Sequence, residues 1–194
     1  MLHRALFAAL ALALAAPAQA ATWTIDDAHS TVGFVVKHLI IAKVRGHFSK
    51  FSGTVVIDEK DITKSTVDVK IDPASIDTDN AKRDEHLRSA EFFDVAKFKD
   101  MAFKSTKIEK LAGGKLRMTG DLTMHGVTKP VVLEGEGPSA EVKDPGGNPH
   151  IAFSMATTIK RADFGLTWNK AIEGGSVVGD DVKLELEIEL KGKK

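Results

Sequence analysis

The side chains best suited to metal chemistry in this sequence are six histidines that follow residue 20. They are His29, His38, His47, His86, His125 and His150. None stands in an HxH or HExxH arrangement, and the chain has no cysteine, so a zinc site would have to gather histidines and carboxylates from distant segments. The alternative, which the spacing favours, is that these histidines lie at strand ends and in turns. We therefore predict no metal, and the lack of cysteine also excludes thiol chemistry and disulfide bonds.

The sequence carries no motif for nucleophilic or phosphate chemistry. It contains no G-x-S-x-G elbow, and no serine stands in a glycine-rich sharp turn, although composition does not exclude a triad of serine, histidine and aspartate. The glycine pairs in GGKLRMTG and GGNPH are typical of hairpin turns rather than of phosphate-binding loops. We predict no catalytic residue and no cofactor.

The first twenty residues have the pattern of a secretory signal peptide. Arg4 precedes an apolar run over residues 5–16, and Ala18-Gln19-Ala20 is a small-x-small cleavage site. The run is shorter than the roughly 20 residues of a membrane-spanning helix, and no later stretch is apolar enough to span a bilayer. A retained N-terminal anchor is the alternative, and without cysteine it would not be a lipoprotein anchor. We expect a signal peptide over 1–20, cleavage after Ala20, a domain over 21–194 and a periplasmic location.

Cleavage would leave 174 of the 194 residues, with 26 basic and 27 acidic side chains and a net charge of −1, because Arg4 is removed. Such a balance provides no electrostatic footprint for nucleic acid. An exported chain without disulfides is held together by its core alone, and this length is enough to bury one. We predict a single domain that does not bind nucleic acid.

Alternation of apolar and polar residues dominates the rest of the sequence. It runs through residues 30–38, 51–58, 66–72, 116–124, 151–160 and 182–190. Period-two patterning is typical of strands with one dry face and one wet face, and turn signals such as AGG and DPGGNP separate the segments. Roughly eight or more antiparallel strands make a closed barrel or a sandwich, and the barrel is favoured because closure removes exposed sheet edges.

The inward-facing residues of these strands mix large, small and flexible side chains, which suits a lined cavity and an ordinary core equally well. If there is a cavity, we expect its lining to include Phe34, Val36, Phe51, Val69, Phe103, Met118, Leu122, Met124, Phe153, Met155 and Leu186.

One polar interval, residues 77–95, breaks the alternation. Asp79 or Asn80 can cap a short helix that runs to about Ser89. Leu87, Phe92 and Phe93 are the apolar residues of this interval, and the nearest dry surface is one end of the sheet. We predict that they cover this end, either as a lid that moves or as a static plug.

The segment GDLTMHGVTKPVVLEGEG, residues 120–137, combines a histidine with hairpin signals. Gly126 lets the backbone turn without a Cβ clash, and Pro130, which lacks an N–H, fits the start of a strand. We expect His125 to hold the turn in place, and a contact of His125 with the polar end of a ligand stays open.

Several segments, in the same order, resemble the YceI-like family over nearly the whole chain after residue 20. They are WTIDDAHSTVGFVVKHL, KVRGHFSKFSGTVVID, IDPASIDTDNAKRDEHLRSAEFFDVAKF, GDLTMHGVTKPVVL, TTIKRADFGLTW and VGDDVKLELEIEL. The most specific is the L-T-hydrophobic-H-G-V-T-K-P hairpin.

The resemblance implies an all-β fold, an extended antiparallel lipocalin-like barrel with one short helix and a hydrophobic interior cavity. It implies that the barrel holds an isoprenoid or other long-chain amphiphilic lipid, for transport, storage or stress-related sequestration, and that the chain forms homodimers as family members often do. Under this hypothesis His38, His125 and Arg161 are the candidates for polar head-group contacts. The alternatives are an envelope enzyme acting on a lipid and a structural barrel with a protein partner.

Overall fold

A computed structural model of the chain describes residues 20–192. The predicted signal peptide lies outside the described residues except for Ala20, which is the first residue of a strand. Among the described residues, no helix is long and apolar enough to cross a membrane.

The described residues form fourteen strands, one α-helix and four short 3-10 helices. The strands are β1 (Ala20–Ile25), β2 (Thr31–His38), β3 (Ala42–Phe48), β4 (Phe51–Asp58), β5 (Thr66–Ile71), β6 (Ile76–Asp77), β7 (Met101–Lys110), β8 (Lys115–Met124), β9 (Val127–Glu136), β10 (Val142–Lys143), β11 (Pro149–Lys160), β12 (Ala171–Ile172), β13 (Gly175–Ser176) and β14 (Val178–Gly192). The helices are η1 (Ile62–Lys64), η2 (Pro73–Ser75), α1 (Ala81–Arg88), η3 (Ala112–Gly114) and η4 (Arg161–Phe164).

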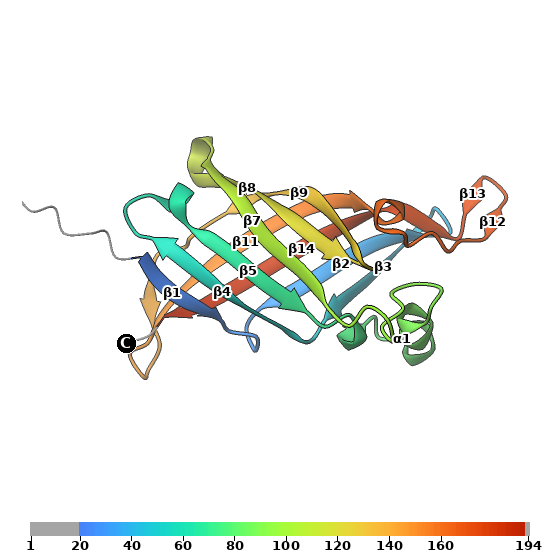
Figure 1. Cartoon of the computed structure of the whole chain (residues 1–194), viewed down its shortest axis with the longest axis horizontal. Coiled ribbons are helices and arrows are strands. Elements are labelled where there is room, and N and C mark those ends of the chain that lie inside the picture. Colours follow the sequence, from blue (N-terminus) through green and yellow to red (C-terminus); the bar gives the residue numbers. More distant parts are fainter. Residues whose placement is uncertain (1–19, 193–194) are drawn as a thin grey trace, which may run out of the picture.

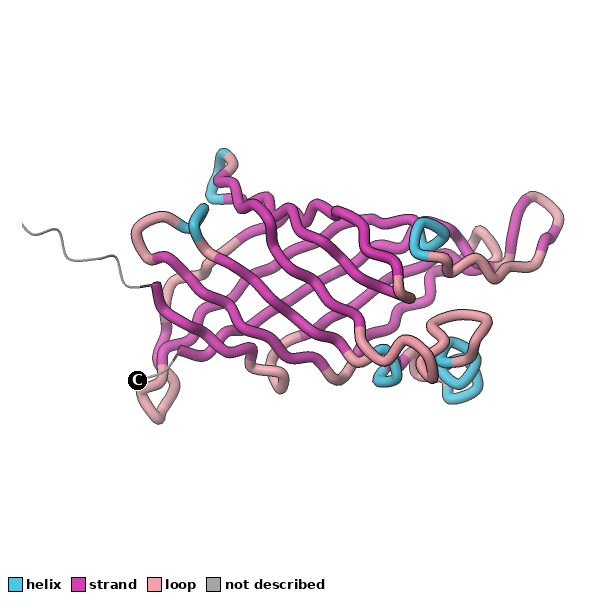
Figure 2. Tube along the Cα trace, in the orientation of Figure 1, coloured by secondary structure: helices cyan, strands magenta, loops and turns pink. Residues whose placement is uncertain are grey.

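Eight strands close into an antiparallel barrel. Their order is β11-β9-β8-β7-β5-β4-β1-β14, and the pairing of β14 with β11 completes the ring. The barrel is elongated, with α1 and the β12–β13 hairpin at the end opposite to β1 (Figure 1), and strands make up nearly all of its wall (Figure 2). The predicted fold class, a lipocalin-like barrel with one short α-helix, is confirmed.

The longest strand, β14, organises the closure. It pairs with β11 from His150↔Lys191 to Lys160↔Asp181, and its other edge is shared by β1 near Leu190 and by β2 from Glu187 to Val178. Strict alternation is needed on such a strand, because a slip of one residue would turn every apolar side chain outward. From β14 the sheet continues through β2 to β3 and β6.

The seam between β9 and β11 is short. Only three residue pairs join these strands, from Ser154↔Glu136 to Ala156↔Glu134. Beyond the seam η4 and the residues after it take over, and Phe164 and Leu166 bury their side chains in the main core. The barrel wall at this end therefore depends on side-chain packing rather than on a sheet ladder.

The predicted helix is α1. Asn80 is its N-cap, and the Asn80 side chain accepts a hydrogen bond from the backbone N–H of Arg83 at 3.0 Å. Arg88 donates to the carbonyl oxygens of Ala74 and Ile76, both at 2.7 Å, which fixes the helix against the segment before it. The 77–95 interval is thus held in place by polar contacts as well as by its apolar residues.

Candidate functional site

An apolar cavity of about 160 Å³ lies inside the barrel. Its walls come from all eight strands of the ring and from β2 and β3, and no lining residue has a side chain that hydrogen bonds. The lining residues are Ile25, Val32, Gly33, Phe48, Phe51, Val55, Val67, Val69, Ile71, Met101, Phe103, Met118, Leu122, Met124, Val131, Leu133, Phe153, Met155, Ile159, Leu184, Leu186, Ile188 and Leu190. An apolar space of this kind stays dry and accepts apolar guests.

The alternation of β14 explains why the cavity is dry. Leu184, Leu186, Ile188 and Leu190 face inward, and Lys183 and the three glutamates between these residues lie on the opposite face of the strand. Across the ladder Met155 is the partner of Leu186 and Phe153 the partner of Ile188, so that β11 presents its apolar face to the same space. No charged group therefore reaches the interior from these two strands.

Glycine and methionine shape the cavity. A Cβ at Gly120 would lie 2.4 Å from the Cζ of Phe103, so the ring of Phe103 occupies the place that a larger residue would need. Four methionines, Met101, Met118, Met124 and Met155, are buried in the lining. Because methionine has three rotatable bonds and no branches, this part of the wall can repack around a guest.

Nine of the eleven residues expected in a lining surround the cavity. They are Phe51, Val69, Phe103, Met118, Leu122, Met124, Phe153, Met155 and Leu186. They were predicted because, within each alternating strand, they occupy every second position and so lie on the same face. Whether they touch a ligand is a separate question, and their contact with one stays a prediction.

Phe34 and Val36 are not among the residues that line this cavity, and their contact with a ligand stays a prediction. The ring of Phe34 packs against that of Phe48, with centroids 5.7 Å apart, and lies over Gly46, where no Cβ is in the way. Val36 pairs with Val44 and Val182 farther along β2, beyond the lining residues of that strand. Both positions have inward parity, and Phe34 pairs with Leu184, which lines the cavity, so parity and register alone do not explain why these two side chains are outside the lining.

Leu87, Phe92 and Phe93 lie at the α1 end of the barrel in two separate places, with Phe92 buried and the other two partly buried. Leu87 and Phe93 pack on the main core, and the ring of Phe93 meets that of Phe48 edge-on at 5.7 Å. Phe92 instead packs against His86 and Trp168, with both ring centroids at 5.0 Å, and these two rings also meet each other at 4.9 Å. Phe93 thus touches a lining residue, whereas Phe92 joins α1 to the segment before β12.

The imidazole of His125 holds the tip of the β8–β9 hairpin. Its Nδ1 donates to the carbonyl oxygen of Phe164 at 3.2 Å, and its ring lies against Phe98 with centroids 4.5 Å apart. His125 itself has a φ of 52°, beside Gly126 at 74°. The contact attaches the hairpin to η4, at the end where the β9–β11 ladder is missing.

Arg161 is buried, and its guanidinium donates to backbone carbonyl oxygens. These are the carbonyls of Gly179 at 2.9 Å, Leu166 at 2.5 Å and Trp168 at 2.9 Å. His38 pairs with Val178 at the start of β14, the strand that also contains Gly179. The three residues expected near a head group, His38, His125 and Arg161, therefore lie around one end of the barrel. Arg161, however, has most of its donors committed to the fold.

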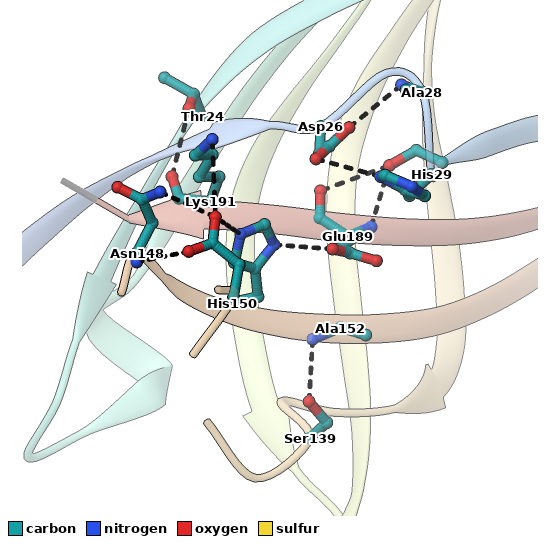
Figure 3. A network of polar contacts seen from close by, with 12 residues as sticks. Thr24, Asp26, Ala28, His29, Ser139, Asn148, His150, Ala152, Glu189 and Lys191 are labelled. Carbon is teal, nitrogen blue, oxygen red and sulfur yellow. Dashed lines mark hydrogen bonds and ion pairs between the residues drawn. The ribbon is translucent and has the colours of Figure 1, made fainter. Parts of the chain in front are cut away.

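A polar network lies near the opposite end of β14 (Figure 3). Glu189 accepts a hydrogen bond from the Nδ1 of His150 at 2.7 Å, and its carboxylate also approaches Asp26 and His29, with one potential ligand atom from each of these three residues within 4.8 Å of the others. The sequence alone did not bring Asp26 and His29 together with Glu189, which follows 160 residues later; the β1–β14 pairing does so.

Asp26 and His29 of this network already pair with each other. The Asp26 carboxylate accepts from the Ala28 N–H at 3.2 Å and pairs with the Nδ1 of His29 at 3.2 Å, and this hydrogen bond raises the pKa of His29. A protonated imidazole is not a metal ligand. Nearby, hydrogen bonds from Asn148 lower the pKa of Asp144 to about 2, so that this carboxylate stays ionised.

Some of the other lining residues lie outside the six alternating segments. Phe48 belongs to β3 and Met101 to β7, neither of which is among the six alternating segments. In β7 a register shift between Ser105 and Lys107 leaves both Phe103 and Ile108 buried, five positions apart. Val131 and Leu133 lie in the second strand of the 120–137 hairpin, and their alternation with exposed residues was the available signal.

The sequence pattern of the YceI-like domain matches residues 23–190. A UPF0312 protein of Vibrio parahaemolyticus is 39% identical over 198 residues, covering 100% of both chains. Among solved structures, the YCEI protein of Campylobacter jejuni is 38% identical with a TM-score of 0.70, covering 87% of this chain and 96% of that one. A polyisoprenoid-binding domain of Saccharophagus degradans has the same fold, with a TM-score of 0.64 at 18% identity and coverage of 90% and 100%.

We predict that Asp26, His29 and Glu189 hold no metal in solution, since the Asp26 carboxylate and the His29 imidazole already pair with each other. Protein purified without a histidine tag should contain far less than one transition metal per chain by elemental analysis. Added zinc should shift the melting temperature of the native chain and of Glu189→Gln equally. A zinc-dependent rise that Glu189→Gln abolishes would contradict the prediction.

Proposed function

The chain belongs to the YceI-like family, and from that premise we propose that it holds the apolar tail of one isoprenoid or similar long-chain amphiphilic lipid inside its barrel. The observation that carries the proposal is the cavity, which is enclosed by 23 residues without a single hydrogen-bonding side chain. The polyisoprenoid-binding domain of Saccharophagus degradans, which has the same fold, supports an isoprenoid as the guest.

The driving force is the removal of hydrocarbon from water. Each buried CH₂ contributes about 0.8 kcal/mol, and a tail enclosed by aliphatic and aromatic side chains needs no directional contact for that gain. Such a site favours long, flexible, apolar chains over any particular head group. The polar end of the ligand would then face one of the barrel's ends.

The free volume implies that the barrel adapts to its ligand. The cavity of about 160 Å³ lies below the roughly 300–1,000 Å³ of typical small-molecule pockets. A long tail therefore has to displace side chains, and the four lining methionines are the ones that do so at least cost. We propose that Met101, Met118, Met124 and Met155 change rotamer when the lipid enters.

A binding role suits the cavity better than either alternative. An enzyme acting on the enclosed lipid would need an acid, base or nucleophile at the tail, and the lining offers none. A structural barrel with a protein partner would gain nothing from an internal space, because close packing is what stabilises a core. We further propose that the protein acts in the periplasm, where it carries or stores the lipid, and that it does so without a cofactor.

The substitution Val69→Phe tests the cavity by filling it. Val69 lines the free space, so a larger ring should take up room that the tail needs. We expect the affinity for a fluorescent prenyl lipid to fall about tenfold or more, equivalent to ~1.4 kcal/mol, in a titration followed by fluorescence.

The matched control is Val132→Phe, the same change at an exposed position of β9. This variant should bind the lipid as the native chain does. If Val69→Phe is folded by circular dichroism and still binds with native affinity, the ligand lies elsewhere and the proposed function is wrong.

We also propose that Phe93 belongs to a lid. It contacts Phe48, whose side chain lines the cavity, from a loop that follows α1. A lid predicts that Phe93→Ala speeds transfer of the fluorescent lipid to vesicles several-fold in stopped-flow measurements, with a small change in melting temperature. A static plug predicts native release and a loss of stability approaching the roughly 3–5 kcal/mol of a truncated core phenylalanine.

Phe92→Ala removes the contact between Phe92 and Trp168 and leaves the contact between Phe93 and Phe48 in place, so it measures the first contact by itself. Ile62→Ala, in η1 beside the core cluster of Trp23 and Ile57, controls for general loosening of the barrel. Equal acceleration by Ile62→Ala and Phe93→Ala would exclude a lid.

A further inference from the structure

Three consecutive aliphatic residues project from the barrel at the turn between β2 and β3. We call Leu39, Ile40 and Ile41 the apolar tip. Their exposed fractions are 39%, 48% and 88%, so a large part of each side chain is in contact with solvent. Single exposed aliphatic residues are common on soluble proteins, whereas contiguous ones mark interaction sites.

The backbone of the apolar tip is strained. Leu39 has a φ of 49° and Ile40 a φ of 68°. Positive φ is unfavourable for a β-branched residue, and tight hairpins that need it normally use asparagine, aspartate or glycine. Leu39 and Ile40 thus adopt an unfavourable backbone conformation and leave much of their side chains exposed, which indicates a use for them outside the fold.

Unneutralised positive charge stands directly behind the apolar tip. Lys37 and Lys43 are cross-strand partners, an arrangement in which like charges repel. Neither lysine forms an ion pair with any residue that the structure describes. From residue 37 to residue 50 the sequence has no acidic residue, and the nearest base beyond the lysines, Arg45, pairs with Glu185 at 2.9 Å.

The apolar tip lies at the same end of the barrel as α1. The N–H of Leu39 donates to the carbonyl oxygen of Val177 at 2.9 Å, and Ile40 packs against the backbone of the β12–β13 turn, its Cδ1 2.7 Å from where a Cβ of Gly175 would be. Figure 1 shows that hairpin and α1 at the same end of the barrel, so the apolar tip and α1 share this end.

We propose that the apolar tip inserts into the surface of a lipid bilayer that carries anionic head groups, with Lys37 and Lys43 on the phosphates. Aliphatic side chains flanked by lysine match the depth profile of such a surface, since apolar groups enter the acyl region and ammonium groups stay among the head groups. A patch of three side chains is smaller than a stable protein interface, which buries about 800 Å² per partner.

Docking in this position would bring the α1 end of the barrel to the membrane. That the docked protein exchanges its guest with the bilayer rests on the proposed function, whereas the docking itself does not. The two are therefore measured separately.

The test is flotation of the full chain with vesicles made of equal parts phosphatidylethanolamine and phosphatidylglycerol, compared with vesicles of phosphatidylcholine alone. We expect binding to the anionic vesicles that weakens as salt is added. The double variant Ile40→Ser with Ile41→Ser should bind about tenfold more weakly, because it removes two aliphatic side chains that would be buried in the bilayer. Lys37→Gln with Lys43→Gln should abolish the preference for anionic vesicles.

The control is Val142→Ser, which removes an aliphatic residue of 63% exposure from β10, beside His150 at the other end of the barrel. It should float as the native chain does. Lipid affinity of the barrel, titrated with the fluorescent prenyl lipid, should be native in all these variants, which separates a failure of docking from a failure of the cavity.

Equal flotation of the native chain and the Ile40→Ser, Ile41→Ser variant would overturn the proposal, as would no flotation of either. Sedimentation velocity decides whether the occupant is a second copy of the chain. If the serine variant dissociates a native dimer and the native chain ignores vesicles, the apolar tip is a dimer contact instead.

Discussion

Closure of the β11–β14 ladder is the interaction on which the rest of the structure depends. It joins the last strand to the ring over most of its length and so turns an open sheet into a barrel with an inside. Once the ring is closed, every second residue of each strand faces a space that water does not reach, and only apolar side chains can stand there without an unmet hydrogen bond. The dry cavity follows from this constraint rather than from any special motif. Because its lining has no polar groups, the cavity suits a hydrocarbon tail better than a catalytic reaction.

The two ends of the barrel differ, and the difference gives the molecule a direction. At the β1 end, Trp23, Ile57 and Ile151 form a compact apolar cluster with Leu190, and the network around Glu189 and His150 ties the last strand to its neighbours. At the α1 end the ladder between β9 and β11 stops, and His125, Arg161 and the buried side chain of Phe164 hold the wall together instead. Side-chain contacts open at lower cost than a continuous ladder. Under the proposed function, the α1 end is where we expect a ligand to pass.

Much of this fold could be predicted from the sequence, because strand alternation is a local signal. Alternation identified the strands that contain Val69, Met118, Met155 and Leu186. The polar interval contains the helix α1, with Asn80 as its N-cap, as predicted.

The parts of the structure that the sequence did not predict have physical causes. The bulge in β7 shifts the parity between Phe103 and Ile108, and a strict period of two does not describe such a strand. Phe34 and Val36 have the right parity but are not in the lining, and the ring of Phe34 packs against Phe48 and over Gly46, a contact that parity does not contain. The turn that forms the apolar tip could not be predicted, because it contains none of the residues that usually mark turns. Leu39 and Ile40 adopt positive φ there against their preference. The approach of Asp26 and His29 to Glu189 depends on long-range pairing that no local pattern contains.

The most direct test of the account is to ask what the barrel contains when it is isolated from its own cell envelope. Native mass spectrometry of the purified chain, followed by solvent extraction and identification of the released compound, measures this without any added ligand. The account predicts one lipid per chain with a long apolar tail, lost when the protein is denatured and absent from a barrel filled by a larger side chain. A correctly folded native chain that carries only traces of lipid, and that takes none up from the membrane fraction of the same cells, would contradict it.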